Sequence, residues 1–62
     1  MKAWRSTDKL LPEIGVLVLA VHYKGFPILA EWDGEMWIDD HNHTHYSHEV
    51  TYWMPIPLLP LE

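Results

Sequence analysis

The chain has 62 residues, a formal net charge of −5 and no cysteine, so neither a disulfide nor a thiolate zinc site can stabilise its fold. A domain of this size buries only about 60% of the surface that its unfolded chain exposes, and its core is correspondingly small. The acidic balance argues against nucleic-acid binding, which needs a basic patch. The longest apolar run, Ile14 to Val21, is shorter than the roughly 20 residues that a membrane-crossing helix requires. We therefore expect a single domain over residues 1–62, with no nucleic-acid or membrane partner.

Turn-forming residues divide the chain into short segments. Residues 7–15 form a loop with Asp, Pro and Gly, which can hold one helical turn capped by Thr7 or Asp8. After it, β-branched and aromatic runs bounded by Gly and Pro predict four strands, over residues 16–23, 26–32, 35–38 and 50–54. Prolines after residue 54 end the strand pairing and leave a Pro-rich C-terminal tail. The expected fold is mainly β, a small antiparallel sheet of about four strands.

The turn between the second and third predicted strands has a clear signal. Asp33-Gly34 is a dipeptide typical of a two-residue hairpin, in which both central residues of a type I′ turn need positive φ. We therefore predict a type I′ turn there.

The first predicted strand is apolar on both faces. Its alternating side chains are Val16, Val18, Ala20 and His22 on one side and Leu17, Leu19, Val21 and Tyr23 on the other. A strand with two apolar faces needs cover on both. The cover can come from the segment around Trp4, from the Leu10-Leu11 loop, from the tail over residues 58–61 or from a second copy of the chain. We expect a homo-oligomer, with a folded-back tail as the competing explanation.

The tryptophans divide into core and surface candidates. Trp32 and Trp53 alternate with apolar neighbours, and we predict that both are buried, because a small sheet gains much of its apolar area from Trp. Trp37 lies beside a tight turn and acidic residues, and it is the better surface candidate, since Trp is enriched among interface hot spots. The expected contact surface for a partner with a basic surface consists of Trp37, Glu35, Asp39 and Asp40.

Motifs at the two ends of the chain point to a family. Residues 4–15 read WRSTDKLLPEIG, residues 50–57 read VTYWMPIP, and residues 31–37 between them read EWDGEMW. Together they resemble the phage and prophage domain-of-unknown-function family 551 over nearly the whole chain. An extra Leu before Pro12, and Tyr52 where the family pattern usually has His, are departures from it. The resemblance implies a phage or prophage accessory protein in the cytoplasm of a bacterial host, and it brings no established catalytic residues.

The segment over residues 39–49 reads DDHNHTHYSHE and contains four of the five histidines. If the segment stays extended, alternate side chains share one face, about 6.6–7 Å apart. That face carries Asp39, His41, His43 and His45. A turn at Ser47 can bring back His48 or Glu49, and imidazole and carboxylate ligands suit Zn²⁺, Ni²⁺ or Cu²⁺.

A polar loop is the competing interpretation of this segment. Asn, Thr and Ser between strands are typical of solvated, flexible connections, and His-rich tracts also bind metal weakly. We favour the loop without a cofactor. The alternative is a Zn²⁺ or Ni²⁺ site made by His41, His43, His45 and His48.

The sequence contains no recognisable catalytic constellation. A zinc hydrolase needs an open ligand position, a general base and a substrate cleft, and Glu49 and Asp40 are the candidates for the base. Ser6 and Ser47 lack the Gly-rich elbow of a nucleophilic serine. We therefore predict a non-enzymatic accessory protein that binds a host protein, in host takeover or counter-defence. The alternative is a small-ligand or metal-binding module built on residues 41–48.

Overall fold

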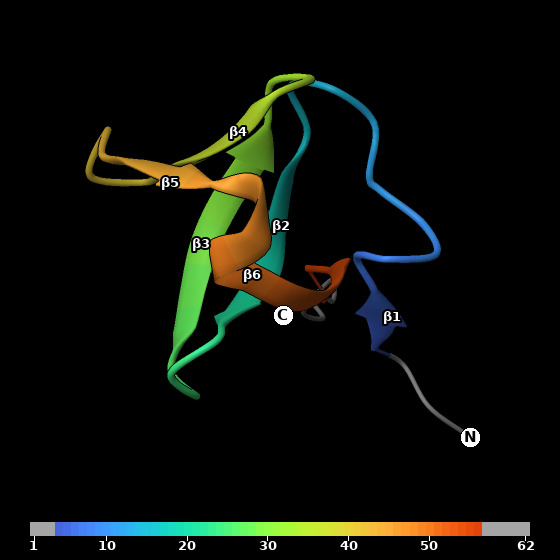
Figure 1. Cartoon of the computed structure of the whole chain (residues 1–62). Helices are drawn as coiled ribbons and strands as arrows, with labels where there is room; N and C mark the ends of the chain where they lie inside the picture. The colour runs from blue at the N-terminus through green and yellow to red at the C-terminus, as the bar shows by residue number, and fades with distance from the viewer. Residues whose placement is uncertain (1–3, 57–62) are drawn as a thin grey trace, which may run out of the picture.

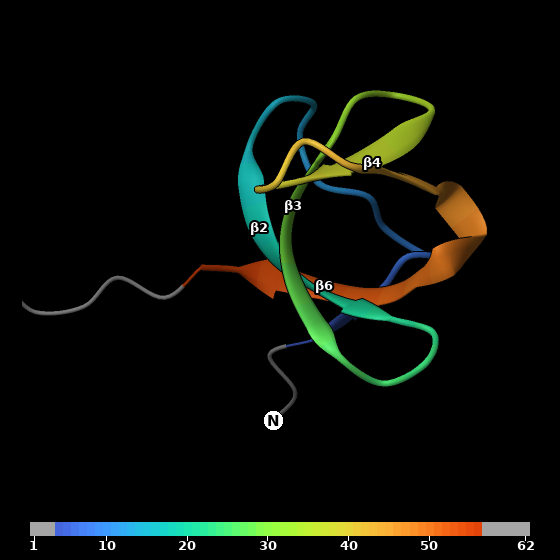
Figure 2. The ribbon, with the colours of Figure 1, turned by 90° about the vertical axis from the view of Figure 1, so that its left-hand side faces the viewer.

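The computed structural model describes residues 4–56, which form one sheet of six strands in the spatial order β1-β6-β2-β3-β4-β5 (Figure 1). Every neighbouring pair of strands is antiparallel. The elements are β1 (Arg5–Ser6), β2 (Leu17–His22), β3 (Pro27–Trp32), β4 (Met36–Asp39), β5 (Thr44–Tyr46), the 3₁₀ helix η1 (Ser47–Glu49) and β6 (Val50–Pro55). The sheet curls, so that β2 lies on one side of the ring of elements and η1 on the other, with β6 running between them (Figure 2). Among residues 4–56, no helix is long and apolar enough to cross a membrane.

The expected β class is confirmed. The four predicted strands correspond to β2, β3, β4 and β6, whose ends differ from the prediction by one residue. The sequence did not predict β1 or β5, which have two and three residues. Strand β5 lies in the histidine segment, whose Asn, Thr and Ser are typical of loops. It forms because its backbone pairs with β4, so tertiary context overrides the local preference.

The N-terminal loop contains a turn and no regular helix. The amides of Lys9 and Leu10 both donate to the carbonyl of Ser6 at 3.0 Å. Thr7 attaches this loop to the sheet, because its hydroxyl donates to the carbonyl of Val50 at 2.8 Å. The loop therefore lies beside the start of β6.

The loop between β3 and β4 differs from the predicted type I′ turn. Trp32 and Trp37 are direct cross-strand neighbours, so the loop between them has four residues. Gly34 has a positive φ of 104°, whereas Asp33 is not among the residues with positive φ. The carboxylate of Asp33 instead accepts hydrogen bonds from the amides of Glu35 and Met36, at 2.8 and 2.7 Å. A side-chain acceptor therefore holds this loop, which the dipeptide alone did not indicate.

The core lies on the inner face of the curled sheet. It contains Val18, Ala20, Ala30, Trp32, Trp37, Val50 and Trp53. The predicted burial of Trp32 and Trp53 is confirmed. The predicted surface position of Trp37 is wrong, because this side chain is 0% exposed and its ring lies 5.3 Å from that of Trp32. Trp37 faces inward because direct cross-strand neighbours share one face of a sheet.

The opposite, outer face of the sheet is not covered by the part of the chain that the structure describes. Leu17 on β2 is 42% exposed. Trp4, Leu10 and Leu11, which the sequence offered as cover, are all exposed themselves. The tail over residues 58–61 lies outside the described residues.

Candidate functional site

The structure separates the histidines of the segment over residues 39–49. His41 and His43 lie at the turn between β4 and β5, and their side chains are 80% and 77% exposed. His48 is exposed on η1 and stacks on Tyr46, with ring centroids 5.7 Å apart. His45 points inward, because it pairs across the sheet with the buried Trp37. The four predicted metal ligands therefore do not converge.

A tight turn is the reason that the extended arrangement does not form. Asn42 adopts a left-handed conformation with φ of 67°, which Asn tolerates better than most residues. The amide of Asn42 donates to the carbonyl of Asp39 at 2.9 Å. The segment folds back at this point, and the His41 ring lies beside Asp40, 3.8 Å from its carboxylate. The ring of His43 stays exposed, with Nδ1 4.0 Å from the Oδ2 of Asp39 that His45 contacts at 2.8 Å.

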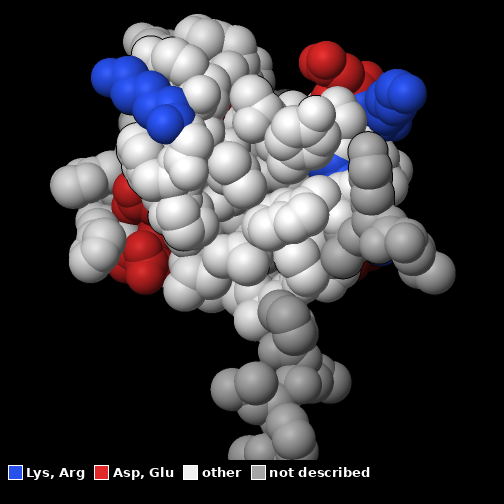
Figure 3. All heavy atoms as spheres, turned by 90° about the horizontal axis from the view of Figure 1, so that it is seen from below, with Lys and Arg blue, Asp and Glu red and all other residues white. Residues whose placement is uncertain are grey.

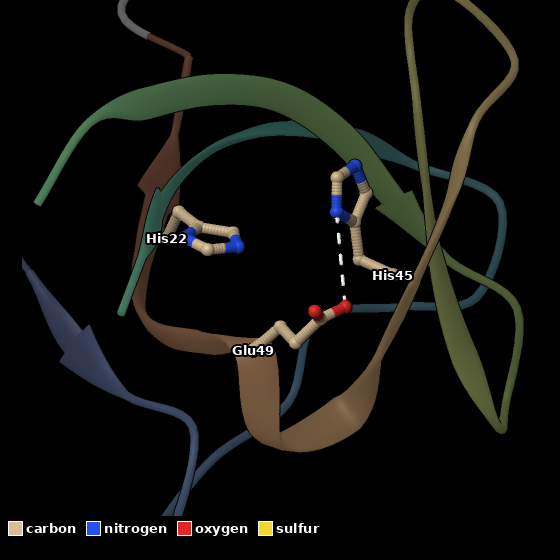
Figure 4. Close-up of side chains that lie close together, drawn as sticks. All are labelled: His22, His45 and Glu49. Carbon is tan, nitrogen blue, oxygen red and sulfur yellow. Dashed lines mark ion pairs between the residues drawn. The ribbon is translucent and has the colours of Figure 1, made fainter. Parts of the chain in front are cut away.

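A different group, the histidine cluster, lies inside the curl of the sheet and consists of His22, His45 and Glu49 (Figure 4). Each residue offers one possible metal-ligating atom, and these atoms lie within 4.8 Å of one another. His22 comes from the end of β2, His45 from β5 and Glu49 from the end of η1. His22 is 6% exposed, and the side chains of His45 and Glu49 are 19% and 26% exposed.

His22 was not among the predicted site residues, although the sequence carried a signal for it. It occupies an inward position after Val18 and Ala20 in the alternation of β2. A titratable ring on an otherwise apolar, buried face needs polar partners. The sequence could not identify those partners, because they are 23 and 27 residues away along the chain.

Hydrogen bonds set the orientation of the His45 ring. Its Nε2 lies 2.8 Å from Oδ2 of Asp39. A carboxylate accepts, so this nitrogen carries the proton and the lone pair of the neutral ring is on Nδ1. Nδ1 lies 3.9 Å from Oε1 of Glu49. Glu49 is itself oriented, because the same oxygen accepts from the amide of Tyr46 at 2.8 Å.

The His22 ring is fixed by a turn and by aromatic packing. Its Nδ1 accepts a hydrogen bond from the amide of Lys24 at 3.1 Å, so the neutral ring carries its proton on Nε2. The ring stacks on Phe26, with centroids 4.4 Å apart, and contacts Tyr23 at 4.6 Å. Figure 4 shows the free edge of this ring turned toward His45 and Glu49.

Asp39 anchors the β4–β5 turn as well as His45. Its Oδ1 accepts from the amides of His41 and His43, both at 2.9 Å. The hydrogen bond from His45, followed by that from the His43 amide, lowers the pKa of Asp39 from 3.8 to about 2. The side chain of Asp39 is only 10% exposed. Because Trp37 is buried as well, Glu35 and Asp40 are the two exposed residues of the contact surface that the sequence predicted.

The outer face of β6, β2, β3 and β4 is a second candidate surface. Cross-strand neighbours form three rows, which are Tyr52–Val21–Pro27, Met54–Leu19–Leu29 and Leu17–Glu31–Ile38. All nine side chains are half-buried or exposed. Glu31 is the one charged residue in these rows. Figure 3 views the side where β6 lies, and charged side chains there sit mainly toward the margins.

A groove with a volume of about 570 Å³ lies between the N-terminal loop and η1. Its lining consists of Thr7, Asp8, Leu11, Trp32, Ser47, His48, Val50 and Thr51. No residue of the histidine cluster lines it.

No protein-family model, curated protein or solved structure matches the chain. The resemblance of its two ends to the phage and prophage family therefore stays a prediction.

Proposed function

We propose that the protein is a non-enzymatic binding module that takes a protein partner on its outer face, defined by the three rows above. The observation that carries this proposal is the contiguous apolar surface on β6, β2 and β3, which no described segment covers. Soluble proteins rarely expose large continuous apolar patches, and such patches mark interaction sites. A partner would remove this surface from water and thereby supply the driving force for binding.

Glu31 defines the chemistry of the partner. It lies between Leu17 and Ile38 in its row, so an apolar partner would bury its carboxylate without a counter-charge. An unpaired buried charge is costly. The partner therefore presents apolar side chains together with a Lys or Arg opposite Glu31. The net charge of −5 also favours encounters with a basic surface.

The proposed partner still has a basic surface, as the sequence suggested, but it contacts the outer face of the sheet instead of the region around Trp37. The surface expected from the sequence centred on Trp37, which is in the core. The outer face supplies apolar area that the two turns at the ends of β4, which carry Glu35 and Asp40, lack. The resemblance to phage proteins directs the search for the partner to a bacterial host.

Site-specific photo-crosslinking in bacterial cells tests the proposal. A benzophenone amino acid replaces Tyr52, which lies in the outer face, or His41, which is exposed in the β4–β5 turn outside that face. We expect one defined adduct from position 52 and none of that mass from position 41. The purified partner should then bind at least about ten times more weakly to Leu29→Lys, which puts a cation beside the one expected on the partner. Identical adducts from both positions, or full binding by Leu29→Lys, would refute the proposal.

Self-association through the same face is a second candidate, and one observation favours it. Glu31 lies near one end of the β2–β3 hairpin, and Lys24 lies in the turn at the other end. Two copies packed face to face with their hairpins antiparallel would set Glu31 of each copy against Lys24 of the other. Because such an interface has two-fold symmetry, it forms two ion pairs between Glu31 of one copy and Lys24 of the other. The host partner would then compete with the second copy for one surface.

A further inference from the structure

We propose that the histidine cluster binds one divalent transition-metal ion of the Zn²⁺ class, with His22, His45 and Glu49 as its protein ligands. The site is separate from the outer face, because His22 and His45 occupy inward positions of the sheet. It also differs from the metal site considered from the sequence, because His22 was not among those residues and neither His41 nor His43 belongs to the cluster.

The donor set fits such an ion. Two imidazoles and one carboxylate are a known zinc ligand set, which leaves a fourth position for water. Ligands about 2.0–2.2 Å from a tetrahedral ion lie roughly 3.3–3.6 Å apart. The candidate atoms already lie within 4.8 Å of one another. If side-chain rotation moves the ligand atoms by about 1 Å, they reach the distances that a tetrahedral ion requires, and the strands need not rearrange.

Asp39 prepares His45 for this role. A metal-ligating histidine usually donates its second ring N–H to a carboxylate, which fixes the ring and raises its basicity. The 2.8 Å contact between Nε2 of His45 and Asp39 has this form. It leaves the Nδ1 lone pair of His45 beside Glu49, at 3.9 Å from Oε1 (Figure 4). The hydrogen bond that would orient His45 as a metal ligand is thus already formed.

His22 has to change its tautomer to bind the ion. Its Nδ1 now accepts from the amide of Lys24 at 3.1 Å, so the proton of the neutral ring is on Nε2, the nitrogen that remains to face the cluster. Ligation through Nε2 moves this proton to Nδ1. The hydrogen bond from Lys24 is then lost, because two donors would face each other. Metal binding should therefore break this hydrogen bond in the turn between β2 and β3.

Titration of the full chain with Zn²⁺ alone, followed by calorimetry and by ¹⁵N NMR, tests the site. We expect one ion per chain, a histidine ¹⁵N pattern for His22 that changes from the Nε2–H to the Nδ1–H tautomer, and a shifted Lys24 amide. The unfolding midpoint should rise on adding Zn²⁺, because an ordered site contributes its binding energy to folding.

Two variants identify the ligands. Glu49→Gln keeps the side-chain shape and the acceptor for the Tyr46 amide, and we expect its affinity to fall at least about ten-fold. The matched control is His41→Ala with His43→Ala, which removes two exposed imidazoles of the same segment and should leave the affinity unchanged. If the control lost binding and Glu49→Gln kept it, the exposed histidines would be the metal ligands, and the proposal would be overturned. Binding without any change at His22 would overturn it as well.

Discussion

At the scale of single residues, the two best-buried indoles, those of Trp37 and Trp53, differ in one respect. Nε1 of Trp53 donates to the carbonyl of Leu10 at 2.8 Å, whereas Nε1 of Trp37 has no hydrogen-bond partner among the described residues. A buried polar group without a partner costs free energy. Trp37 thus contributes apolar packing against Trp32 at the expense of an unpaired donor.

This difference predicts unequal costs for the same substitution. Trp37→Phe and Trp53→Phe both remove indole packing, but only the second removes a hydrogen bond, while the first removes an unpaired donor. We expect Trp53→Phe to lower the free energy of unfolding by about 1 kcal/mol more than Trp37→Phe. Urea denaturation of the two variants measures the difference. Equal costs, or a larger cost at Trp37, would contradict this assignment of the hydrogen bonds.

The prediction that Trp37 lies at the surface was wrong because it relied on the neighbouring residues alone. The sequence shows acidic residues and a tight turn around it, which are local signals. Its burial follows from its register opposite Trp32, and a four-residue loop sets that register. The predicted two-residue turn would have paired Trp37 with Ala30, which is also buried, so the alternation along the strand indicated an inward Trp37 under either turn type.

At the scale of elements, the β3–β4 loop depends on one carboxylate. The hydrogen bond from the Met36 amide, and then that from the Glu35 amide, lowers the pKa of Asp33 below its ordinary value of 3.8. A folded-state pKa below the unfolded value stabilises the fold fully above about pH 4, and this contribution is lost as the pH falls through the folded value. The loop should therefore be weakened by acid.

Asp33→Asn isolates this effect, because Asn keeps a side-chain acceptor but cannot ionise. We expect the wild type to be more stable than Asp33→Asn at neutral pH and the difference to shrink toward about pH 3. Thermal unfolding of both proteins over this range is the measurement. A difference that stays constant with pH would exclude ionised Asp33 as the source.

Elements with clear alternation were predictable, and the others were not. The runs that became β2, β3 and β6 have apolar and β-branched residues between turn signals, and these define a strand locally. Strand β1 is short and exists through pairing with β6, which is far along the chain, whereas β5 is polar and exists through a local hairpin with β4. The histidine cluster depends on the pairing of β5 with β4, since that register turns His45 inward, whereas His41 and His43 stay exposed around the turn at Asn42. The sequence indicated metal-ligand chemistry but not which residues meet.

At the scale of the whole molecule, the outer face predicts self-association of the purified chain. Sedimentation equilibrium should show a dimer for the wild type and mainly monomer for Glu31→Lys or Lys24→Glu, because each single change sets like charges against each other. The double variant Glu31→Lys with Lys24→Glu should dimerise again, since it only exchanges the two signs. A monomeric wild type, or a double variant that stays monomeric, would rule out this geometry. The double variant should still fail to bind the host partner, because Glu31→Lys sets a cation against the one expected on that partner. It therefore distinguishes self-association from binding of the host protein.

Strand β6 follows the other five strands along the chain but lies between β1 and β2 in the sheet. During synthesis, the hairpins made by β2, β3 and β4 leave the ribosome while one edge of β2 still lacks its neighbour. An unpaired edge is a template for any compatible strand. A nearby copy can therefore donate its β6, with η1 as the hinge, and two chains that exchange this strand recover every backbone pair of the sheet. Because polysomes hold nascent copies of one message close together, we expect any exchange of β6 to occur during synthesis, before β2 has paired with the β6 of its own chain.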